Sequence, residues 1–200
     1  MKVHALALVA LVPCLAASMG DFDKDKVLGN PAAPVQIEIY SDFGCPACKN
    51  FHENMLPVIM RDYVVPGKVC MIPREFPLNI PDHKYSREAA NFATAAARIG
   101  KYQQVSDTLF RNQAAWHETG KVWETIAPVL APAEQKKVQL LVKDPGVTSE
   151  VQRDYDSAMS QRVNQTPTLL IRRGSRQYAF AGPGPDNYLL LRSLIDGLLK

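Results

Sequence analysis

The chain lacks most of the residue patterns that mark a metal site. Its 200 residues contain four cysteines but only one Cys-x-x-Cys pair, formed by Cys45 and Cys48. Zinc binding usually requires a second pair of ligands at matching spacing, and the histidines His52, His83 and His117 are scattered without one. We therefore expect no metal and no other cofactor.

Long apolar runs, charge blocks and internal repeats are also missing. After residue 18, no stretch is long and apolar enough to be a transmembrane helix. The net charge is only +3, and no Lys/Arg block is long enough to indicate a nucleic-acid partner. With 46% hydrophobic and 22% charged residues, the composition is that of a soluble globular protein. The length suits one domain, or one domain that carries an insertion.

The first 18 residues differ from the rest and have the order of a secretory signal. A positive charge at Lys2 is followed by an apolar run at 5–12 and by small residues at 16–18. We predict cleavage after Ser18 and a location in the periplasm or otherwise outside the cytoplasm. The alternative is a lipoprotein site with Cys14 acylated, which Pro13 disfavours because such sites want a small residue at that position.

Removal of that segment would leave three cysteines, which in an exported protein means one pair and one leftover. The leftover is Cys70, which lies in an apolar stretch, 68–72, typical of a strand. Free cysteine is among the most buried residue types, so we expect an inert core thiol. A regulatory or partner-linking thiol is the alternative.

The apolar pattern predicts the element order β-α-β, then a helical block, then β-β-α. Residues 35–40 alternate and are rich in β-formers, which predicts a strand. A long helix is expected to start at Pro46 and to kink at Pro57. A second strand over 69–76 is expected to be broken or bulged near Pro73, which suits a sheet edge or a strand end.

Residues 81–163 carry only helical patterns, and such a block between strand-bearing halves is usually an inserted subdomain. The helices are predicted at 86–97, 102–113, 121–130, 133–142 and 148–163. The last of them has a possible N-cap at Thr148 or Ser149. Short strands at 168–171 and 177–181 follow, and then a final helix that Asp186 could cap.

Cys45 and Cys48 lie where the first predicted strand ends and the first predicted helix begins. A helix N-terminus presents unpaired N–H groups and a partial positive charge, and both stabilise a thiolate, the reactive form of cysteine. Pro46 suits the first helical turn. A purely structural Cys45–Cys48 disulfide is the alternative, but it would close a very small loop and restrict the unfolded chain little. The position therefore favours redox chemistry.

Several segments resemble one known family, the DsbA-like branch of the thioredoxin-fold disulfide oxidoreductases. Residues 37–48, with Asp42-Phe43-Gly44-Cys45-Pro46-Ala47-Cys48, resemble the active-site segment. Residues 74–78 are similar to the segment that closes the next strand, and His83 to the start of the family's helical insertion. Residues 165–168, Gln-Thr-Pro-Thr, are similar to the cis-proline loop that faces the cysteines.

The resemblance implies an α/β thioredoxin fold, a central mixed sheet with flanking helices and an inserted all-helical subdomain. Cys45 would be the exposed nucleophile and Cys48 the more buried resolving thiol, alternating between disulfide and dithiol. Pro167 would be cis, with the backbone of Thr166 free to pair with an extended substrate. The implied division is a signal peptide at 1–18, a lead-in at 19–34, thioredoxin-fold parts at 35–80 and 164–200, and the helical insertion at 81–163.

Glu38 is a possible proton relay for the buried thiol, because the family often holds an acid beneath the cysteines. Glu38 lies seven positions before Cys45, whereas the best-known members place the acid six before. A one-residue slip moves a strand side chain to the other face of the sheet. An ordinary paired strand carboxylate is therefore the open alternative.

The implied function is an exported thiol–disulfide oxidoreductase that introduces or exchanges disulfides in folding proteins, acting as a monomer with a membrane redox partner. Pro46-Ala47 lacks the histidine of the best-known DsbA dipeptide, so we expect a less oxidising protein than those. The alternatives are a reductase or isomerase of the same fold, or a peptide-binding, chaperone-like module without redox turnover.

Overall fold

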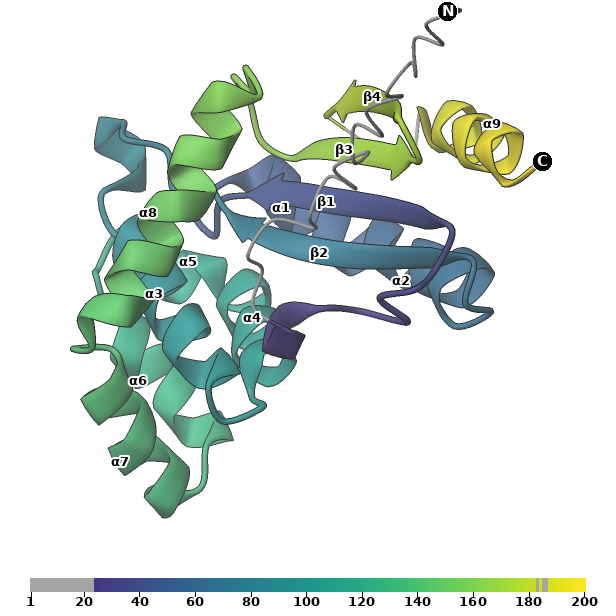
Figure 1. The fold of residues 1–200 in the computed structure, drawn as a ribbon. Helices are drawn as coiled ribbons and strands as arrows, with labels where there is room; N and C mark the ends of the chain where they lie inside the picture. The colour runs from purple at the N-terminus through teal and green to yellow at the C-terminus, as the bar shows by residue number, and fades with distance from the viewer. Residues whose placement is uncertain (1–23, 183, 185–186) are drawn as a thin grey trace, which may run out of the picture.

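A four-stranded mixed sheet forms the centre of the structure, a computed structural model that describes residues 24–182, 184 and 187–200 (Figure 1). The strands are β1 (Val35–Ser41), β2 (Val69–Glu75), β3 (Thr168–Arg173) and β4 (Arg176–Ala181), in the spatial order β2-β1-β3-β4. β1 and β2 are parallel, and the other two pairs are antiparallel. The predicted thioredoxin fold is confirmed.

The two faces of β1 pack against different parts of the chain. Ile37 and Ile39 lie in the core that Phe51 and Ile59 share with the C-terminal helix α9 (Tyr188–Leu199). Tyr40, on the other face, donates or accepts a 2.8 Å hydrogen bond with Ser157 of α8 (Pro145–Ser160). Because side chains alternate along a strand, residue 38 shares the face of Tyr40, and residue 41 shares the face of Ile39.

The helix that contains Cys48 runs without a break from Pro46 to Val64. It consists of α1 (Pro46–Asn50), the π-helical turn η2 (Phe51–Met55), α2 (Leu56–Ile59) and a second π-helical turn, η3 (Met60–Val64). Pro57 lies between the two π turns and lacks an N–H, so the regular hydrogen-bond ladder cannot pass through it. The expected disturbance at Pro57 therefore takes the form of changed helical pitch.

The expected break at Pro73 is wrong, because β2 is continuous and pairs with β1 in unbroken register from Val69 to Glu75. β2 lies at the sheet edge, one of the two predicted places. The Met71 N–H donates outward to the Leu28 carbonyl (3.0 Å). Pro73, two residues on, has its nitrogen on that same outer side, so its missing N–H costs β1 no partner.

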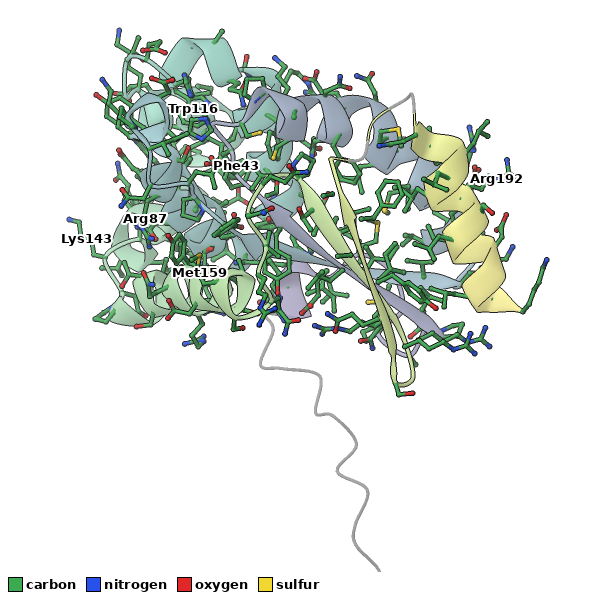
Figure 2. All side chains as sticks on the ribbon, turned by 90° about the horizontal axis from the view of Figure 1, so that it is seen from above. Phe43, Arg87, Trp116, Lys143, Met159 and Arg192 are labelled. Atoms are coloured by element: carbon green, nitrogen blue, oxygen red, sulfur yellow. The ribbon has the colours of Figure 1, made fainter. Side chains whose placement is uncertain are left out.

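The helical insertion gathers at one end of the sheet and α9 at the other (Figure 1). Its elements are η4 (Pro81–His83), α3 (Ser86–Ala97), α4 (Tyr102–Arg111), α5 (Gln113–Trp116), α6 (Val122–Ile126), η5 (Ala127–Val129), α7 (Pro132–Leu141) and α8 (Pro145–Ser160). Figure 2 places Phe43 and Trp116 at the insertion end and Arg192 at the opposite end. Phe43 joins the insertion's core, so the loop before Cys45 is packed by helices.

The expected cap of the last insertion helix is wrong. α8 starts at Pro145, and its N-cap is Asp144, whose carboxylate accepts a 2.8 Å hydrogen bond from the Gly146 N–H. Proline at the first helical position suits this earlier start. The predicted helix at 102–113 is likewise divided, because α4 ends at Arg111 and α5 begins at Gln113.

Some predictions fall outside the described residues. These are the signal segment at 1–18 with Cys14, and Asp186, whose neighbour Asn187 is the N-cap position of α9. The short helix η1 (Lys24–Lys26) is the first described element. Within the described ranges, none of the helices has both the length and the apolar character needed to cross a membrane. The division at 35–80, 81–163 and 164–200 stays a prediction.

Candidate active site

The buried Asp42 carboxylate organises the turn between β1 and the cysteines. One oxygen, Oδ1, accepts a 2.7 Å hydrogen bond from the Gly44 N–H. The other, Oδ2, accepts from the Leu78 N–H at 2.8 Å and lies 2.7 Å from His83 Nδ1. A single side chain thus fastens the turn to the chain after β2 and to the start of the insertion.

The insertion holds the same turn from its other side. The Gln113 amide donates to the carbonyls of Phe43 (2.6 Å) and Cys45 (3.1 Å). Gly44 approaches the insertion so closely that an added Cβ would lie 2.4 Å from Ser86 Oγ and 3.1 Å from the His117 ring. Only a residue without a side chain fits between the turn and α3 without displacing one of them.

The two thiols of the pair differ in exposure, and both are free. Cys45 retains 8% of its surface and Cys48 none, so the nucleophile is less open than expected although it is the more accessible of the two. Pro46 and Ala47 are exposed between them. The Asp42 N–H donates to Cys48 Sγ at 3.5 Å, which directs one backbone donor at the buried sulfur.

The thiols also differ in acidity. Hydrogen bonding from the Cys48 thiol lowers the pKa of Cys45 to about 6, helped by Thr166 and by the N–H groups of residues 47 and 48. Burial raises the pKa of Cys48 well above its ordinary value, and its contact with Cys45 raises it further. A helix start therefore supplies one sulfur that is ionised at neutral pH and one that is protonated.

The loop before β3 meets the cysteines, as the resemblance implied. The Thr166–Pro167 peptide bond is cis. The Cys45 thiol donates to the Thr166 carbonyl at 3.5 Å, across 121 positions of sequence. Pro167 is buried and Thr166 half-buried, and the Gly182 N–H donates to the Pro167 carbonyl at 2.8 Å. Two distant segments thus form one site around Cys45.

Glu38 lies on the opposite face of the sheet from the helix that carries the thiols. Arg74 donates to its Oε1 at 2.6 Å, and Arg172 lies 3.0 Å from its Oε2. Arg74 also bonds Asp154 of α8 at 3.0 Å. These ion pairs match the alternative of an ordinary paired strand carboxylate. None of them joins Glu38 to either thiol, and the relay role of Glu38 stays a prediction.

Cys70 lies on the edge strand β2, away from the pair. It is fully buried and packs with Ala33 and Ile72. Burial raises the pKa of its thiol. The expectation of a buried core thiol is confirmed.

A second cluster of buried charge, centred on Lys26 and Glu75, was not predicted from the sequence. Lys26 Nζ lies 2.8 Å from Glu150 and 3.7 Å from Glu75, and it is only 2% exposed. Tyr102 donates to Glu75 at 2.9 Å. The signal for Glu75 was present, because it lies four positions after Met71 on a strand and therefore on the same core-facing side. Over the described ranges, no three His, Cys, Asp or Glu side chains group closely enough to hold a metal ion.

Comparison with known proteins points to a single family. The curated relatives include a probable disulfide bond formation protein D from Bacillus cereus, 25% identical over 99% of this chain and 94% of the relative. A putative protein-disulfide oxidoreductase from Rickettsia felis is 26% identical over 54% of this chain and 37% of its own length.

Solved structures show the same fold. Wolbachia pipientis alpha-DsbA1 has a TM-score of 0.69 and 21% identity, covering 87% of this chain and 90% of the other. Oxidised BdbD from Bacillus subtilis has a TM-score of 0.66 and 21% identity, covering 87% and 92%. A family model described as thioredoxin matches residues 22–179. Because that match spans most of the chain, including Cys45, Cys48 and the Thr166–Pro167 loop, the chain belongs to this thioredoxin family.

Proposed function

We propose that this chain is a thiol–disulfide oxidoreductase that introduces or exchanges disulfides in other proteins through Cys45 and Cys48. In the oxidising direction, a substrate thiolate attacks Cys45 Sγ, the Cys45–Cys48 bond breaks, and Cys48 leaves as a thiolate. A second thiolate of the substrate then attacks the substrate sulfur that is bonded to Cys45 and releases the Cys45 thiolate. The substrate loses two electrons, and the protein gains them.

The observation that carries this proposal is the asymmetry of the two thiols. The Cys45 thiol has a pKa of about 6 and is the only one of the pair with exposed surface. A thiol of low pKa is both a good leaving group and mostly ionised at neutral pH. Cys48 is buried directly beneath it and can attack only a disulfide formed at Cys45.

The surroundings of Cys45 favour an extended protein segment as substrate. Pro46 and Ala47 are exposed on one side of the sulfur, and the half-buried Thr166 lies on the other. Backbone groups at Thr166 would pair with the substrate as an added strand, with Pro167 packed behind them. The proposed partners are folding proteins with cysteines, together with a membrane redox partner that resets the pair.

The compartment is proposed from the sequence. The N-terminal 18 residues have the order of a secretory signal, and a periplasmic or other exported location supplies substrates in which disulfides persist. A Bacillus cereus relative is named a probable disulfide bond formation protein D, which is consistent with such a location.

Trapping tests the exchange chemistry. With Cys48→Ser, the mixed disulfide at Cys45 cannot be resolved, so exported proteins should accumulate as adducts that a reductant releases. Cys45→Ser should give no adducts. Cys70→Ala combined with Cys48→Ser should give the same adducts as Cys48→Ser alone, because Cys70 is buried away from the site. An absence of adducts with Cys48→Ser would favour the peptide-binding, chaperone-like alternative.

Equilibration with glutathione separates an oxidase from a reductase or isomerase. We expect a Cys45–Cys48 potential less negative than the value of about −270 mV for thioredoxin. A potential at or below that value would reject the oxidase and leave the reductase.

A further inference from the structure

Glu75 is a buried acid on the same face of the sheet as the helix that carries the thiols. It is 2% exposed, and it pairs in register with Ser41 at the ends of the parallel strands β2 and β1. Residues paired in this way point to the same face, here the face of Ile39 and Pro73. Glu38, three register positions earlier, points to the opposite face. Glu75 is therefore the carboxylate that the sheet directs toward the thiol side.

A pocket of about 40 Å³ connects Glu75 to the base of the active-site turn. Its titratable and charged lining residues are Glu75, Tyr102, His52 and Arg74, its hydroxyls come from Ser41 and Ser106, and its apolar lining includes Phe43 and Phe51. A site with that volume and several polar partners is large enough for an ordered water. The exposed Gln103 also lines the pocket, which therefore reaches the protein surface.

Ser41 joins the pocket to the buried sulfur. Its side chain lies close enough to Cys48 to lower the pKa of that thiol, against the rise that burial causes. Ser41 is the last residue of β1, one position before Asp42, whose N–H also reaches Cys48 Sγ. A hydroxyl both donates and accepts, so it can pass a proton between two neighbours.

The charges around Glu75 hold its carboxyl between its two forms near neutral pH. Burial raises its pKa to about 7, Lys26 opposes that rise, and the carboxylates of Asp154 and Glu150 add to it. The Tyr102 hydroxyl donates to Oε1 and favours the ionised form. A group of this kind can both accept and return a proton in the range where the thiol chemistry runs.

We propose that Glu75 accepts the proton of the Cys48 thiol, through the Ser41 hydroxyl and a water in the pocket, and returns it when Cys48 leaves as a thiolate. The inference rests on the proposed function, because it concerns the resolving step at Cys48. Glu75 is a positioning residue for the proton and touches neither sulfur directly.

The step balances in both directions. When Cys48 resolves a mixed disulfide at Cys45, its proton passes to the Glu75 carboxylate, its sulfur bonds to Cys45, and the partner leaves as a thiolate. When a substrate attacks the Cys45–Cys48 disulfide, Cys48 leaves as a thiolate and takes the proton from the Glu75 carboxylic acid. No oxidant or reductant besides the two dithiols takes part.

Stopped-flow reaction of the reduced protein with 5,5′-dithiobis(2-nitrobenzoate) separates the two roles. The first thionitrobenzoate release reports attack by Cys45, and the second reports attack by Cys48 on the adduct. In the parent, the rate of the second phase should rise through an inflection near the pKa of Glu75, about 7. In Glu75→Gln that inflection should vanish, and the second phase at neutral pH should slow by about tenfold or more. The first phase should stay within about twofold, since the groups that lower the Cys45 pKa do not include Glu75.

Glu150→Gln is the matched control, because it removes the carboxylate nearest to Lys26 and leaves Asp154 in place, and Glu150 does not line the pocket. Its second phase should keep the inflection, displaced to lower pH by the loss of a neighbouring negative charge. Ser41→Ala keeps the carboxyl and breaks the path, so it should lose the inflection even if Glu75→Gln fails to fold. An inflection that survives in Ser41→Ala or in folded Glu75→Gln, or one lost equally in Glu150→Gln, would overturn the inference. A missing first phase in the parent would instead overturn the proposed function.

Discussion

Replacing Cys48 by alanine or by serine separates the largest cause of the low Cys45 pKa from the rest of the site. Hydrogen bonding from the Cys48 thiol is the leading cause of that pKa of about 6. Serine keeps a donor at this position, and alanine removes it. A hydrogen bond to a charged group contributes about 1.5–3 kcal/mol, which corresponds to about 1–2 pKa units. We expect the Cys45 pKa to rise by that amount in Cys48→Ala and to stay near its parent value in Cys48→Ser.

Thiolate absorbance at 240 nm and the pH dependence of alkylation by iodoacetamide both measure this pKa. The remaining thiol, Cys70, is buried with a raised pKa and does not titrate in the same range. Equal pKa values in the alanine and serine variants would refute the reasoning and assign the acidity to the helix N–H groups and Thr166. A pKa near the ordinary cysteine value in the parent would refute the site geometry itself.

The low pKa of Cys45 contributes to the redox potential of the pair and to the stability of the reduced protein. At pH 7, a thiol of pKa about 6 stabilises the reduced form by about 1.4 kcal/mol relative to one of pKa about 9, which raises the potential by about 30 mV. The folded-state pKa lies below the unfolded one, so this stabilisation is complete above about pH 9 and is lost as the pH falls through about 6. Urea unfolding of the reduced protein between pH 5 and 9 should show that slope, and Cys45→Ser should lack it.

Three further substitutions test the framework of the site. Gly44→Ala should lower the free energy of unfolding by about 1–3 kcal/mol, because the new Cβ collides with Ser86 Oγ, and Ser86→Ala should recover part of the loss in urea titrations. Glu38→Gln should cost about 1.5–3 kcal/mol, because buried Arg74 loses one of its two carboxylate partners and keeps Asp154, while the pH profile of Cys48 reactivity stays unchanged; a shifted profile would restore the relay role. Asp144→Ala should lower the free energy of unfolding by about 1 kcal/mol through loss of the α8 cap, and an unchanged free energy of unfolding would contradict the capping geometry.

Local patterns in the sequence predict the parts of the site that depend on neighbours in the chain. The alternation at 35–40, Pro46 at a helix start and the helical block after Pro81 all correspond to observed elements. The meeting of Cys45 with the Thr166–Pro167 loop rests on resemblance, because no local pattern reports a contact between segments so far apart. Side-chain alternation along β1 likewise places Glu38 on the face of the sheet away from the thiols, where it pairs with Arg74 and Arg172.

The rest depends on tertiary packing. Pro73 suggested a broken strand, but its nitrogen points to the open side of an edge strand, which only the pairing order reveals. In the sequence, Glu75 is one residue of a segment expected to close the second strand. Its proposed role depends on Ser41, Tyr102 and Lys26, which lie on three other elements. The cap at Asp144 was missed because Thr148 and Ser149 offered equally good capping chemistry a few residues later.

The two hydrogen bonds from Gln113 bear on how this protein could be dissected or redesigned. They fill the acceptors of Phe43 and Cys45 on the very turn that presents the reactive sulfur. A minimal scaffold made by excising the insertion would remove this donor from both carbonyls, leaving the Cys45 carbonyl with the Lys49 N–H and the turn with the hydrogen bonds of Asp42 to Gly44 and Leu78. Grafting the Cys-Pro-Ala-Cys segment onto another thioredoxin scaffold would meet the same loss. Any transferred or shortened version of the site should therefore retain the insertion, which supplies these hydrogen bonds to the active-site turn.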